Sequence, residues 1–574
     1  MSSKTTRVSS ATLKEAMPDR RRCFLLLVLI SVAHVCLPAN AQSLQSVWQW
    51  SVTAKSEKPP GSARAFLWVP PGSHLLRGVV VAQDNMEERS ILENPRFRKT
   101  LADLDFAEMW VSPSFDHVFR FDQGAGDTFN GIMKDLAGIS GYNELNFVPV
   151  VPMGHSAAAS WPYYFATWNP ERTLAAISVS GQWPYFRDPI YAPDIWGDKK
   201  IDYVPALETM GEYEAAGTWA ANGLRDRKQH PLTPLSMLAN PAQGHFASTD
   251  QKVDYLGLYL RKAVQYRMPK KWPGTSAPLL LPIDPTKTGW LVDKWRGNQP
   301  PLAPPAPVGQ YKGDPDQAFW YFDEELAKET ARYEAVDRGL KVELVGLVQD
   351  GAMVPQTNTH LQLTPKFEPE ADGITFELHG AFYDGVPGGS PRPAVWTGLP
   401  AGSPVGHANG GAPIQIGVIQ GPVEQIAPNL FRVAMQKETL PGGVNGSGKY
   451  ELVFAATHPG DAEYRPAVQQ AHIYIPAVNK EGTAQHIDFT NIPDQKKGIG
   501  SIRLKATSSA HLPVSFYVRE GPATVSGDVL TFTDIPVRAK FPIAVTVVAW
   551  QYGRSMEPKV QSALPVAHTF YIVR

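Results

Sequence analysis

The sequence predicts a doubly wound, mostly parallel α/β sheet followed by one or two all-β sandwich domains. Between residues 42 and 274, short apolar runs alternate with amphipathic segments, which is typical of a sheet covered by helices on both faces. From residue 340 to the end the apolar period becomes two, with Gly, Pro and Asp at the turns. Many short strands joined by such turns indicate β-sandwiches.

The composition is that of folded globular domains. Of the 574 residues, 43% are hydrophobic and 19% are charged, which is enough apolar material for sizeable cores. A chain of this length suggests three or four domains. The formal net charge of −1 provides no basic surface for nucleic acid or an anionic membrane, so neither is expected as a partner.

Residues 1–41 have the organisation of a secretory signal peptide. The basic cluster Arg20–Arg22 precedes the 14-residue apolar run Phe24–Leu37, and Ala39–Ala41 forms a small-x-small cleavage site. The apolar run is short for a membrane span, so cleavage after residue 41 is favoured over an uncleaved anchor. No membrane span is expected in the mature chain.

The cysteines point to a compartment for the mature chain. Both of them, Cys23 and Cys36, lie in the signal segment, so the mature chain contains no disulfide. An exported protein without disulfides fits a bacterial periplasm or exterior better than a eukaryotic secretory route. Arg21–Leu25 also resembles the twin-arginine signal, which would export the chain already folded.

Residues 42–274 form the predicted α/β domain. Its expected strands are Ala65–Val69, Gly78–Ala82, Glu108–Val111, Phe147–Val151, Leu174–Val179 and Val204–Thr209. Its clearest expected helices are Phe97–Leu104, Thr128–Ala137 and Lys252–Tyr266. The last helix carries apolar residues at i, i+3, i+4 spacing and is expected to close the domain.

Residues 275–339 are expected to connect the domains. The segment is rich in proline up to about Gln310, which indicates a stiff linker or a loop wrapped around the first domain. A helix is predicted over Asp316–Gly339, and it contains the aromatic run Phe319–Phe322. This run is interpreted as a packed helix face, with a sugar-stacking platform as the alternative.

The rest of the chain is divided into two β-sandwich domains, 340–484 and 485–574, with no helix expected in either. The expected strands are Val342–Val348, Thr375–Tyr383, Ile414–Ile419, Tyr450–Ala455 and His472–Ile475. In the last domain His511–Val518 and Gly521–Gly527 resemble the bacterial immunoglobulin-like modules of secreted enzymes and surface proteins. That resemblance implies a fold and no particular function.

A candidate nucleophile lies in Val148–Ala159, which reads VPVVPMGHSAAA. An apolar strand is followed there by small residues that suit a sharp turn and the start of a helix. Such a turn presents a serine at the top of a sheet, and its neighbours must be small because the strained backbone leaves them no room. Ser156 is therefore the candidate, with Ala158 standing where the usual pattern has glycine.

A nucleophilic serine needs a histidine as base and an acid that orients the histidine. Glu214 follows a glycine turn at the end of a predicted strand, and His245 follows a glycine in the loop before the last helix. The separations of 58 residues from Ser156 to Glu214 and 31 from Glu214 to His245 suit one strand–helix excursion and then one loop. Glu212 and Asp226 stay open as alternative acids.

The oxyanion formed during acyl transfer needs N–H donors that already point at it. The backbone N–H of Ala157 is the first candidate, and that of Gln83, after an early strand, is the second. The side chain of Asn85 is an alternative donor. His155 is interpreted as a packing residue beside the turn, and His117 as a loop residue that could face the substrate.

Residues 42–274 resemble the α/β-hydrolase superfamily, and more closely the secreted bacterial hydrolases of the dienelactone-hydrolase or acetyl-esterase type. The segments that carry the resemblance are Val79–Met86, Gly154–Ala157, Pro170–Val179 and Gly211–Glu214. The resemblance implies the fold and serine-hydrolase chemistry, but no substrate. No metal or other cofactor is expected, because the mature chain has no cysteine and no histidine cluster with ligand spacing.

We therefore expect an exported serine esterase that acts through an acyl-enzyme. Acylated plant or algal polysaccharide is the expected substrate class, from the export signal, the sandwich domains and the aromatic residues near the nucleophile. Those aromatic residues, which alternatively belong to a helix core, are Trp161, Tyr163, Tyr164 and Trp168. A peptidase or lipase with the same triad, and an inactive surface or glycan-binding protein, are the alternatives.

Overall fold

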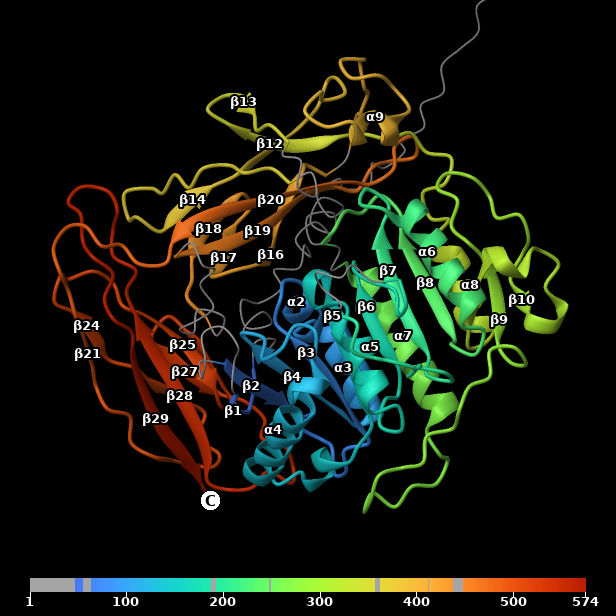
Figure 1. Ribbon diagram of the computed structural model, residues 1–574. Helices are drawn as coiled ribbons and strands as arrows, with labels where there is room; N and C mark the ends of the chain where they lie inside the picture. Colours follow the sequence, from blue (N-terminus) through green and yellow to red (C-terminus); the bar gives the residue numbers. More distant parts are fainter. Residues whose placement is uncertain are drawn as a thin grey trace, which may run out of the picture.

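The computed structural model of the protein describes residues 47–54, 63–186, 193–246, 249–356, 362–410, 412–436 and 448–574. The expected signal peptide and both cysteines lie outside these residues. Figure 1 shows an α/β sheet with its helices at the centre, one β domain above it and a second β domain along its side.

Eight strands form the large sheet: β1 (Trp50–Ala54), β2 (Ala63–Trp68), β3 (Gly78–Gln83), β4 (Phe106–Ser112), β5 (Val150–His155), β6 (Ala176–Val179), β7 (Ala206–Gly211) and β8 (Leu235–Asn240). Their order is β1-β2-β4-β3-β5-β6-β7-β8. Strand β2 is antiparallel to both of its neighbours, and the pairs from β4 to β8 are parallel. This order and this single reversal are those of the α/β-hydrolase fold, so the predicted fold class is confirmed.

The helices of this domain are α2 (Glu88–Leu92), α3 (Pro95–Leu104), α4 (Ala125–Ser140), α5 (Trp161–Trp168), α6 (Ala216–Gln229) and α7 (Asp250–Arg267). Alternate residues of the central strands enter two separate cores, because successive side chains of a strand point to opposite faces. In β3, Val80 and Ala82 belong to the core that includes α3 and α7. Val79 and Val81 belong to the core that includes α4 and α5.

Local signals set the ends of the expected helices. The side chain of Asn94 accepts a hydrogen bond from the N–H of Arg96 at the start of α3, with Pro95 in the first turn. Helix α3 ends at Asp105, which has a φ of 56°. The Thr249 side chain caps α7 in the same way, by accepting from the N–H of Lys252.

The secondary structure of residues 275–339 differs from the prediction, which placed a single helix over 316–339. Their elements are β9 (Trp290–Asp293), β10 (Ala306–Pro307), β11 (Ala318–Tyr321) and α8 (Glu324–Tyr333). The aromatic run is therefore mostly a strand, paired with β9, and the helix starts only where Asp323 caps the N–H of Leu326. Aromatic residues favour strands, and burial on every side lets them form one here. The Trp320 carbonyl accepts a hydrogen bond from Ser236 of β8 at 2.5 Å, so the segment packs onto the edge of the large sheet.

The middle β domain contains β12 (Val345–Gln349), β13 (Ala352–Met353), β14 (Thr375–Glu377), β15 (His379–Phe382), β16 (Gln415–Gln420), β17 (Val423–Ala427), β18 (Leu430–Val433), β19 (Lys449–His458) and β20 (Ala467–Pro476). They form three small antiparallel sheets. The single strand expected over Thr375–Tyr383 is split, because β14 pairs with β18 and β15 pairs with β12. The expectation of no helix is wrong, since α9 (Arg392–Thr397) starts after Pro391 and ends at Gly398 with a φ of 67°.

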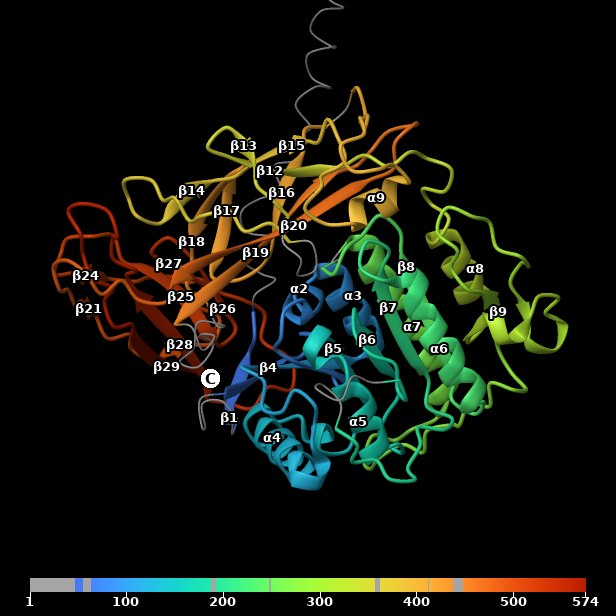
Figure 2. The same cartoon turned by 45° about the horizontal axis from the view of Figure 1, so that its top comes forward.

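The last domain contains β21 (Ile487–Phe489), β22 (Gln495–Lys496), β23 (Ser501–Arg503), β24 (Ala506–Ser508), β25 (Ser515–Glu520), β26 (Ala523–Ser526), β27 (Val529–Phe532), β28 (Ile543–Trp550) and β29 (Val566–Val573). It lies against the β1 edge of the large sheet, where the Trp48 carbonyl accepts a hydrogen bond from the N–H of Gly521 at 2.8 Å. Figure 2 shows the two β domains on adjoining sides of the α/β domain.

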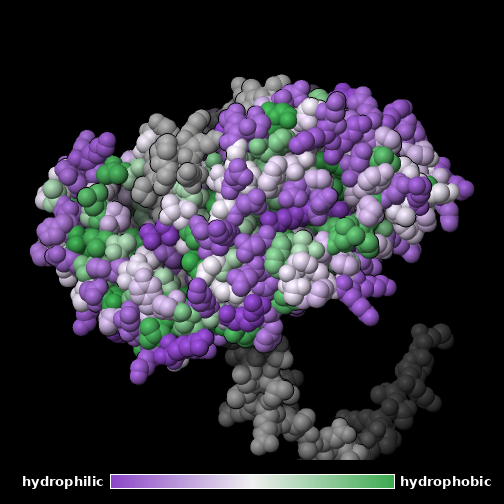
Figure 3. All heavy atoms as spheres, turned by 60° about the horizontal axis from the view of Figure 1, so that its bottom comes forward, coloured by the Kyte–Doolittle hydropathy of each residue, from purple (hydrophilic) through white to green (hydrophobic). Residues whose placement is uncertain are grey.

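The surface carries no single apolar band on the face that Figure 3 shows, where hydrophobic residues lie in small groups among polar ones. Among the described residues, no helix has the length and hydrophobicity needed to cross a bilayer.

Candidate active site

Ser156 lies at the turn that follows β5. It is the first residue of the short 3-10 helix η3 (Ser156–Ala158), which leads into α5. Its φ is +53°, a left-handed conformation that residues other than glycine rarely adopt. The side chain is half-buried. The structure thus places the predicted serine on a strained strand-to-helix turn at the carboxyl end of a central strand.

The neighbours of Ser156 are small because the backbone of the turn is crowded. A Cβ atom on Gly154 would lie 2.0 Å from the carbonyl oxygen of Ala158 and 2.7 Å from the Trp161 ring. A Cβ atom on Gly181 would lie 1.9 Å from that of Ala159. Ala158 has no positive φ, so its methyl group is accommodated where the usual pattern has glycine.

His245 and Glu214 are hydrogen-bonded to each other, with 2.7 Å between Nδ1 of the imidazole and Oε1 of the carboxylate. Their side chains are 3% and 13% exposed. Glu214 comes from the loop after β7 and His245 from the loop after β8. A carboxylate at Nδ1 holds the proton on that nitrogen and leaves Nε2 able to accept one.

The two loops that carry this pair are packed together. A Cβ atom on Gly211 would lie 2.2 Å from the carbonyl oxygen of Gly244. The N–H of Tyr213 donates to the carbonyl of Gln243 at 2.9 Å. A glycine at position 211 is therefore needed for Glu214 and His245 to meet.

His155 brings the histidine loop to the serine turn. Its ring centroid is 4.7 Å from that of His245, and its Nε2 is 3.1 Å from the backbone oxygen of His245. Because His155 directly precedes Ser156 in the chain, His245 lies beside the turn. Beneath His155, Glu87 forms an ion pair with Lys252 at 3.0 Å, and both of these side chains are fully buried.

The alternative acids have other partners. The Glu212 carboxylate pairs with Arg465 at 3.1 and 2.5 Å and accepts the N–H of Ala242 at 2.8 Å. Asp226 accepts two backbone N–H groups, those of residues 185 and 186, each at 2.8 Å. Of the three acids considered from the sequence, Glu214 is therefore the one placed against His245.

The candidate oxyanion donors lie around the end of β3. Gln83 is fully buried, and its side-chain amide holds the neighbouring loop by donating to the carbonyl of Asp116 and accepting from Ser114. The role assigned to its backbone N–H stays a prediction. The side chain of Asn85 donates from Nδ2 to the carbonyl oxygen of His155 at 2.9 Å, which places this amide beside the serine turn.

Glu88 was not identified from the sequence, although it joins the two parts of the site. One carboxylate oxygen accepts the N–H of His155 at 2.6 Å, and the other accepts those of Asn85 at 3.2 Å and Met86 at 2.8 Å. Burial raises the pKa of Glu88 to about 8. No motif marks this residue, because its partner on β5, His155, is 67 positions away. His117 is exposed beside the same loop, 3.3 Å from the Asp84 carbonyl.

The aromatic residues after Ser156 are core residues, which is the alternative that the sequence left open, so they give no support to a polysaccharide substrate. Trp161, Tyr163 and Tyr164 are fully buried. The Trp161 indole donates to the Met153 carbonyl at 2.9 Å. Trp168, partly buried, packs edge-on against Phe129 and neighbouring rings.

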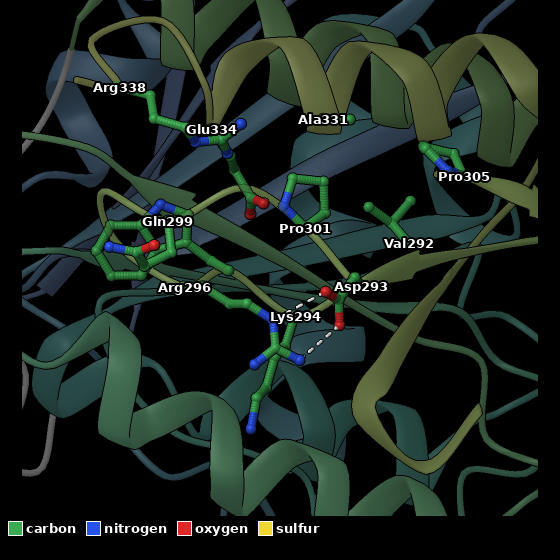
Figure 4. Close-up of a pocket in the computed structure, with 11 residues that line it drawn as sticks. Val292, Asp293, Lys294, Arg296, Gln299, Pro301, Pro305, Ala331, Glu334 and Arg338 are labelled. Atoms are coloured by element: carbon green, nitrogen blue, oxygen red, sulfur yellow. Dashed lines mark hydrogen bonds and ion pairs between the residues drawn. The ribbon is translucent and has the colours of Figure 1, made fainter. Parts of the chain in front are cut away.

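A small pocket open to solvent lies elsewhere, between α8, β9 and the loop that follows β9. Figure 4 shows the carboxyl group of Glu334 directed into it, with Arg338 on its rim. Burial raises the pKa of Glu334 to about 8, and one of its oxygens accepts the N–H of Ala239 at 3.0 Å. Within the described ranges, no group of three His, Cys, Asp or Glu residues could hold a metal ion.

Comparisons with known proteins return likenesses among solved structures alone. No family model matches the chain, and no curated protein matches it. A poly(3-hydroxybutyrate) depolymerase, LpqC, from Bordetella parapertussis is 13% identical, with a TM-score of 0.28, over 41% of this chain and 97% of its own. Est1E from Butyrivibrio proteoclasticus is 15% identical, with a TM-score of 0.26, over 38% and 99%.

A dienelactone hydrolase from Anabaena variabilis is also similar, at 14% identity and a TM-score of 0.26, over 38% of this chain and 96% of its own. The strand order and the turn at Ser156 give the described residues between 47 and 274 the α/β-hydrolase fold.

Proposed function

We propose that the protein is a serine hydrolase, most specifically a carboxylic esterase, with Ser156, His245 and Glu214 as its triad. The observation that carries the proposal is the 2.7 Å hydrogen bond between His245 and Glu214, in loops packed beside a serine with a φ of +53°. A buried acid–imidazole pair next to a strained serine turn is the arrangement that activates a hydroxyl for acyl transfer.

The proposed reaction has two halves. The Oγ of Ser156 attacks the ester carbonyl while Nε2 of His245 takes its proton, and the same proton then goes to the leaving alcohol. Glu214 stabilises the imidazolium formed in between. A water molecule, deprotonated by His245, then attacks the acyl-enzyme, and Ser156 regains its proton as the acid is released.

Two groups are proposed as donors to the oxyanion. The N–H of Ala157 is one, because the first N–H groups of a helix have no partner within it. For the second we favour Asn85 over Gln83, because Gln83 is fully buried within β3 and the Asn85 side chain lies beside the serine turn. The N–H groups of Asp84, Asn85 and Met86 already donate to Val111 or Glu88. The amide of Asn85 uses one N–H on the His155 carbonyl and has a second to offer.

The substrate class and location are proposed from the sequence. Acyl groups on an extracellular polysaccharide are the substrate we propose, with export through the N-terminal segment to a bacterial periplasm or exterior. The β domains, of which we propose the last to be immunoglobulin-like, are of the sort found on such enzymes. The buried aromatic residues of α5 no longer contribute to this argument.

A fluorophosphonate probe tests the nucleophile. We expect the full-length protein to be labelled at Ser156 and the Ser156→Ala variant to be unlabelled and inactive on 4-nitrophenyl acetate. Ser160→Ala is the matched control, because this buried serine lies on the same turn. Absence of labelling on the folded wild type would refute the proposal. Acetylated xylan, feruloyl esters, long-chain esters and peptide amides then decide between an esterase, a lipase and a peptidase.

Two isosteric variants test the acid. Glu214→Gln should lower kcat by up to about 10⁴-fold, because an amide no longer selects the correct imidazole tautomer. Glu212→Gln should cost far less, since that carboxylate contacts Arg465. A larger loss for Glu212→Gln would contradict the assignment.

A further inference from the structure

The two loops that carry Glu214 and His245 are contacted from outside by the middle β domain. Residues from β20, from the turn before it and from α9 reach these loops, although they lie 179 to 253 positions further along the chain. Figure 2 shows β20 and α9 above the ends of β7 and β8.

Arg465 is the central contact on the acid loop. Its guanidinium pairs with both oxygens of Glu212 at 3.1 and 2.5 Å, and its Nε donates to Asp337 at 2.7 Å. The side chains of Arg465, Glu212 and Asp337 are only 6%, 15% and 5% exposed. One arginine therefore joins the acid loop, the segment after α8 and the middle β domain through a bidentate, largely buried pair.

Gln470 is the contact on the histidine loop. Its Nε2 donates to the carbonyl oxygen of Phe246, the residue after His245, at 2.9 Å. The Gln470 side chain is packed so closely that a Cβ on Gly244 would lie 2.9 Å from that nitrogen. The residue is 3% exposed, so this contact is shielded from water.

A third contact covers the residue between the two acids. The Tyr213 ring lies against Trp396 of α9, with 4.3 Å between ring centroids. The backbone oxygen of Tyr213 is 3.5 Å from a guanidinium nitrogen of Arg392. The acid loop is thus held on its side chains and on its backbone by one neighbouring domain.

We propose that Arg465 and Gln470 are positioning residues for the hydrolytic site, so that the middle β domain completes the α/β domain's active site. This inference rests on the proposed function for its catalytic meaning. Arg465 fixes the acid loop and Gln470 fixes the histidine loop, and together they set the distance between Glu214 and His245. Neither residue touches the reacting atoms.

The proposal has a physical basis in how steeply catalysis depends on geometry. A displacement of about 1 Å in a catalytic group, caused by a change far from the chemistry, lowers the rate by about 10²-fold. The loops after β7 and β8 contact each other through Gly211 and Gly244, so a shift of either loop changes the Glu214–His245 hydrogen bond.

Arg465→Met and Gln470→Leu in the full chain test the proposal. We expect kcat on 4-nitrophenyl acetate, per serine titrated with the fluorophosphonate, to fall about 10- to 100-fold with little change in KM. Arg465→Lys should fall between wild type and Arg465→Met, because it keeps the charge and loses the bidentate geometry. It also replaces Arg465→Met if that variant does not fold.

Hydrogen exchange supplies a readout that does not need activity. In both variants the amides of residues 211–214 and 243–246 should exchange faster, while the rest of the α/β domain is unchanged. Arg432→Met and Gln425→Leu are matched controls, because Arg432 pairs with exposed Glu424 and Gln425 donates to a carbonyl within the same β domain. The proposal would be overturned if amide exchange in these loops did not change. It would also be overturned if the control variants lost as much kcat as Arg465→Met and Gln470→Leu. If the wild type proved inactive, the proposed esterase function would be refuted. The exchange measurement would still show whether Arg465 and Gln470 hold the two loops in place.

Discussion

Three residues at the carboxyl edge of the large sheet have left-handed backbone conformations. Ser156 after β5, Ser180 after β6 and Ala242 after β8 all have positive φ values, of 53°, 48° and 54°. Each costs about 1–2 kcal/mol for a residue with a side chain. Such conformations persist where the surroundings over-determine them, as the Trp161 indole bond to the Met153 carbonyl does here. At Ser156 the strained turn, held in this way, supports its proposed role as the nucleophile.

At the residue scale, a substitution of Asn85 should lower the rate of the chemical step without weakening substrate binding. Asn85→Ala removes a donor that we place at the oxyanion, so kcat should fall about 10²–10³-fold with KM little changed. Gln83→Leu is the comparison, because the Gln83 amide holds the loop of residues 114–116. It should lower thermal stability more than kcat. Steady-state kinetics with melting curves for both variants check this, and equal kcat losses would argue against Asn85 as the donor.

Part of the site could be predicted from the sequence. Ser156, Glu214 and His245 follow glycine-containing turns in the expected order, and such signals are local. Glu88 and Arg465 gave no local signal, because their partners His155 and Glu212 lie 67 and 253 positions away. Contacts of that kind depend on how whole elements pack, which short sequence patterns do not contain.

At the scale of elements, β5 shows why strand ends were misplaced. The sequence predicted a strand over 147–151, although proline at position 152 cannot donate to a sheet ladder. The strand instead runs to His155. Val150 donates to the Arg172 carbonyl, so the residue at 152 would donate to Leu174 in the same ladder. Arg267 of α7 donates to the Leu174 carbonyl at 2.7 Å instead, which compensates for the missing N–H of proline.

Helix α8 protects an edge of the same sheet. Strand β8 is the last strand, and its N–H groups on that side need partners. Glu334 supplies one by accepting the N–H of Ala239. The Tyr333 hydroxyl donates to the Asn240 side chain at 2.8 Å. The segment 275–339, which was expected to be a connector, thus covers an edge of the large sheet. Its proline content did not indicate this role.

The buried carboxyl of Glu334 should make stability depend on pH. Burial raises its pKa to about 8, above the value near 4.3 of an unfolded chain. The folded state therefore holds the proton more tightly, so this stabilisation is complete below about pH 4 and is lost as the pH rises through 8. Glu334→Gln keeps the acceptor for Ala239 and removes the ionisation.

Thermal melts of wild type and Glu334→Gln check this. The two melting temperatures should be close near pH 5, and the variant should be more stable by several degrees near pH 9. Glu329→Gln on α8 serves as control, because its partly exposed carboxylate pairs with Arg332 at the surface. A difference between wild type and Glu334→Gln that does not change with pH would contradict the prediction.

At the scale of the whole molecule, the domains inferred from the sequence share cores. Val518 and Ile543 of the last domain belong to the same buried cluster as Val79 of β3. Trp550 of β28 lies in the core of the middle β domain with Phe454. The period-two pattern predicted the two β domains, but it could not show which faces they present to one another, because those contacts join distant segments.

Shared cores imply that the domains unfold together. Arg538 joins the last domain to the α/β domain by pairing with Glu144 at 2.6 Å and by donating to the His74 carbonyl at 2.7 Å. Glu144 is 4% exposed. Arg538→Met leaves this carboxylate without its cation, which should cost about 1.5–3 kcal/mol. In calorimetry the main transition of the whole chain should then move to lower temperature.

The control is Arg503→Met, since Arg503 pairs with Asp528 in solvent within the last domain, with side chains 72% and 50% exposed. It should leave the transition in place, as surface pairs contribute about 0–1 kcal/mol. If Arg538→Met instead splits off a separate low-temperature transition and leaves the main one unmoved, the last domain folds on its own. Joint unfolding would mean that the loops around Ser156 owe part of their rigidity to contacts made along the whole length of the chain.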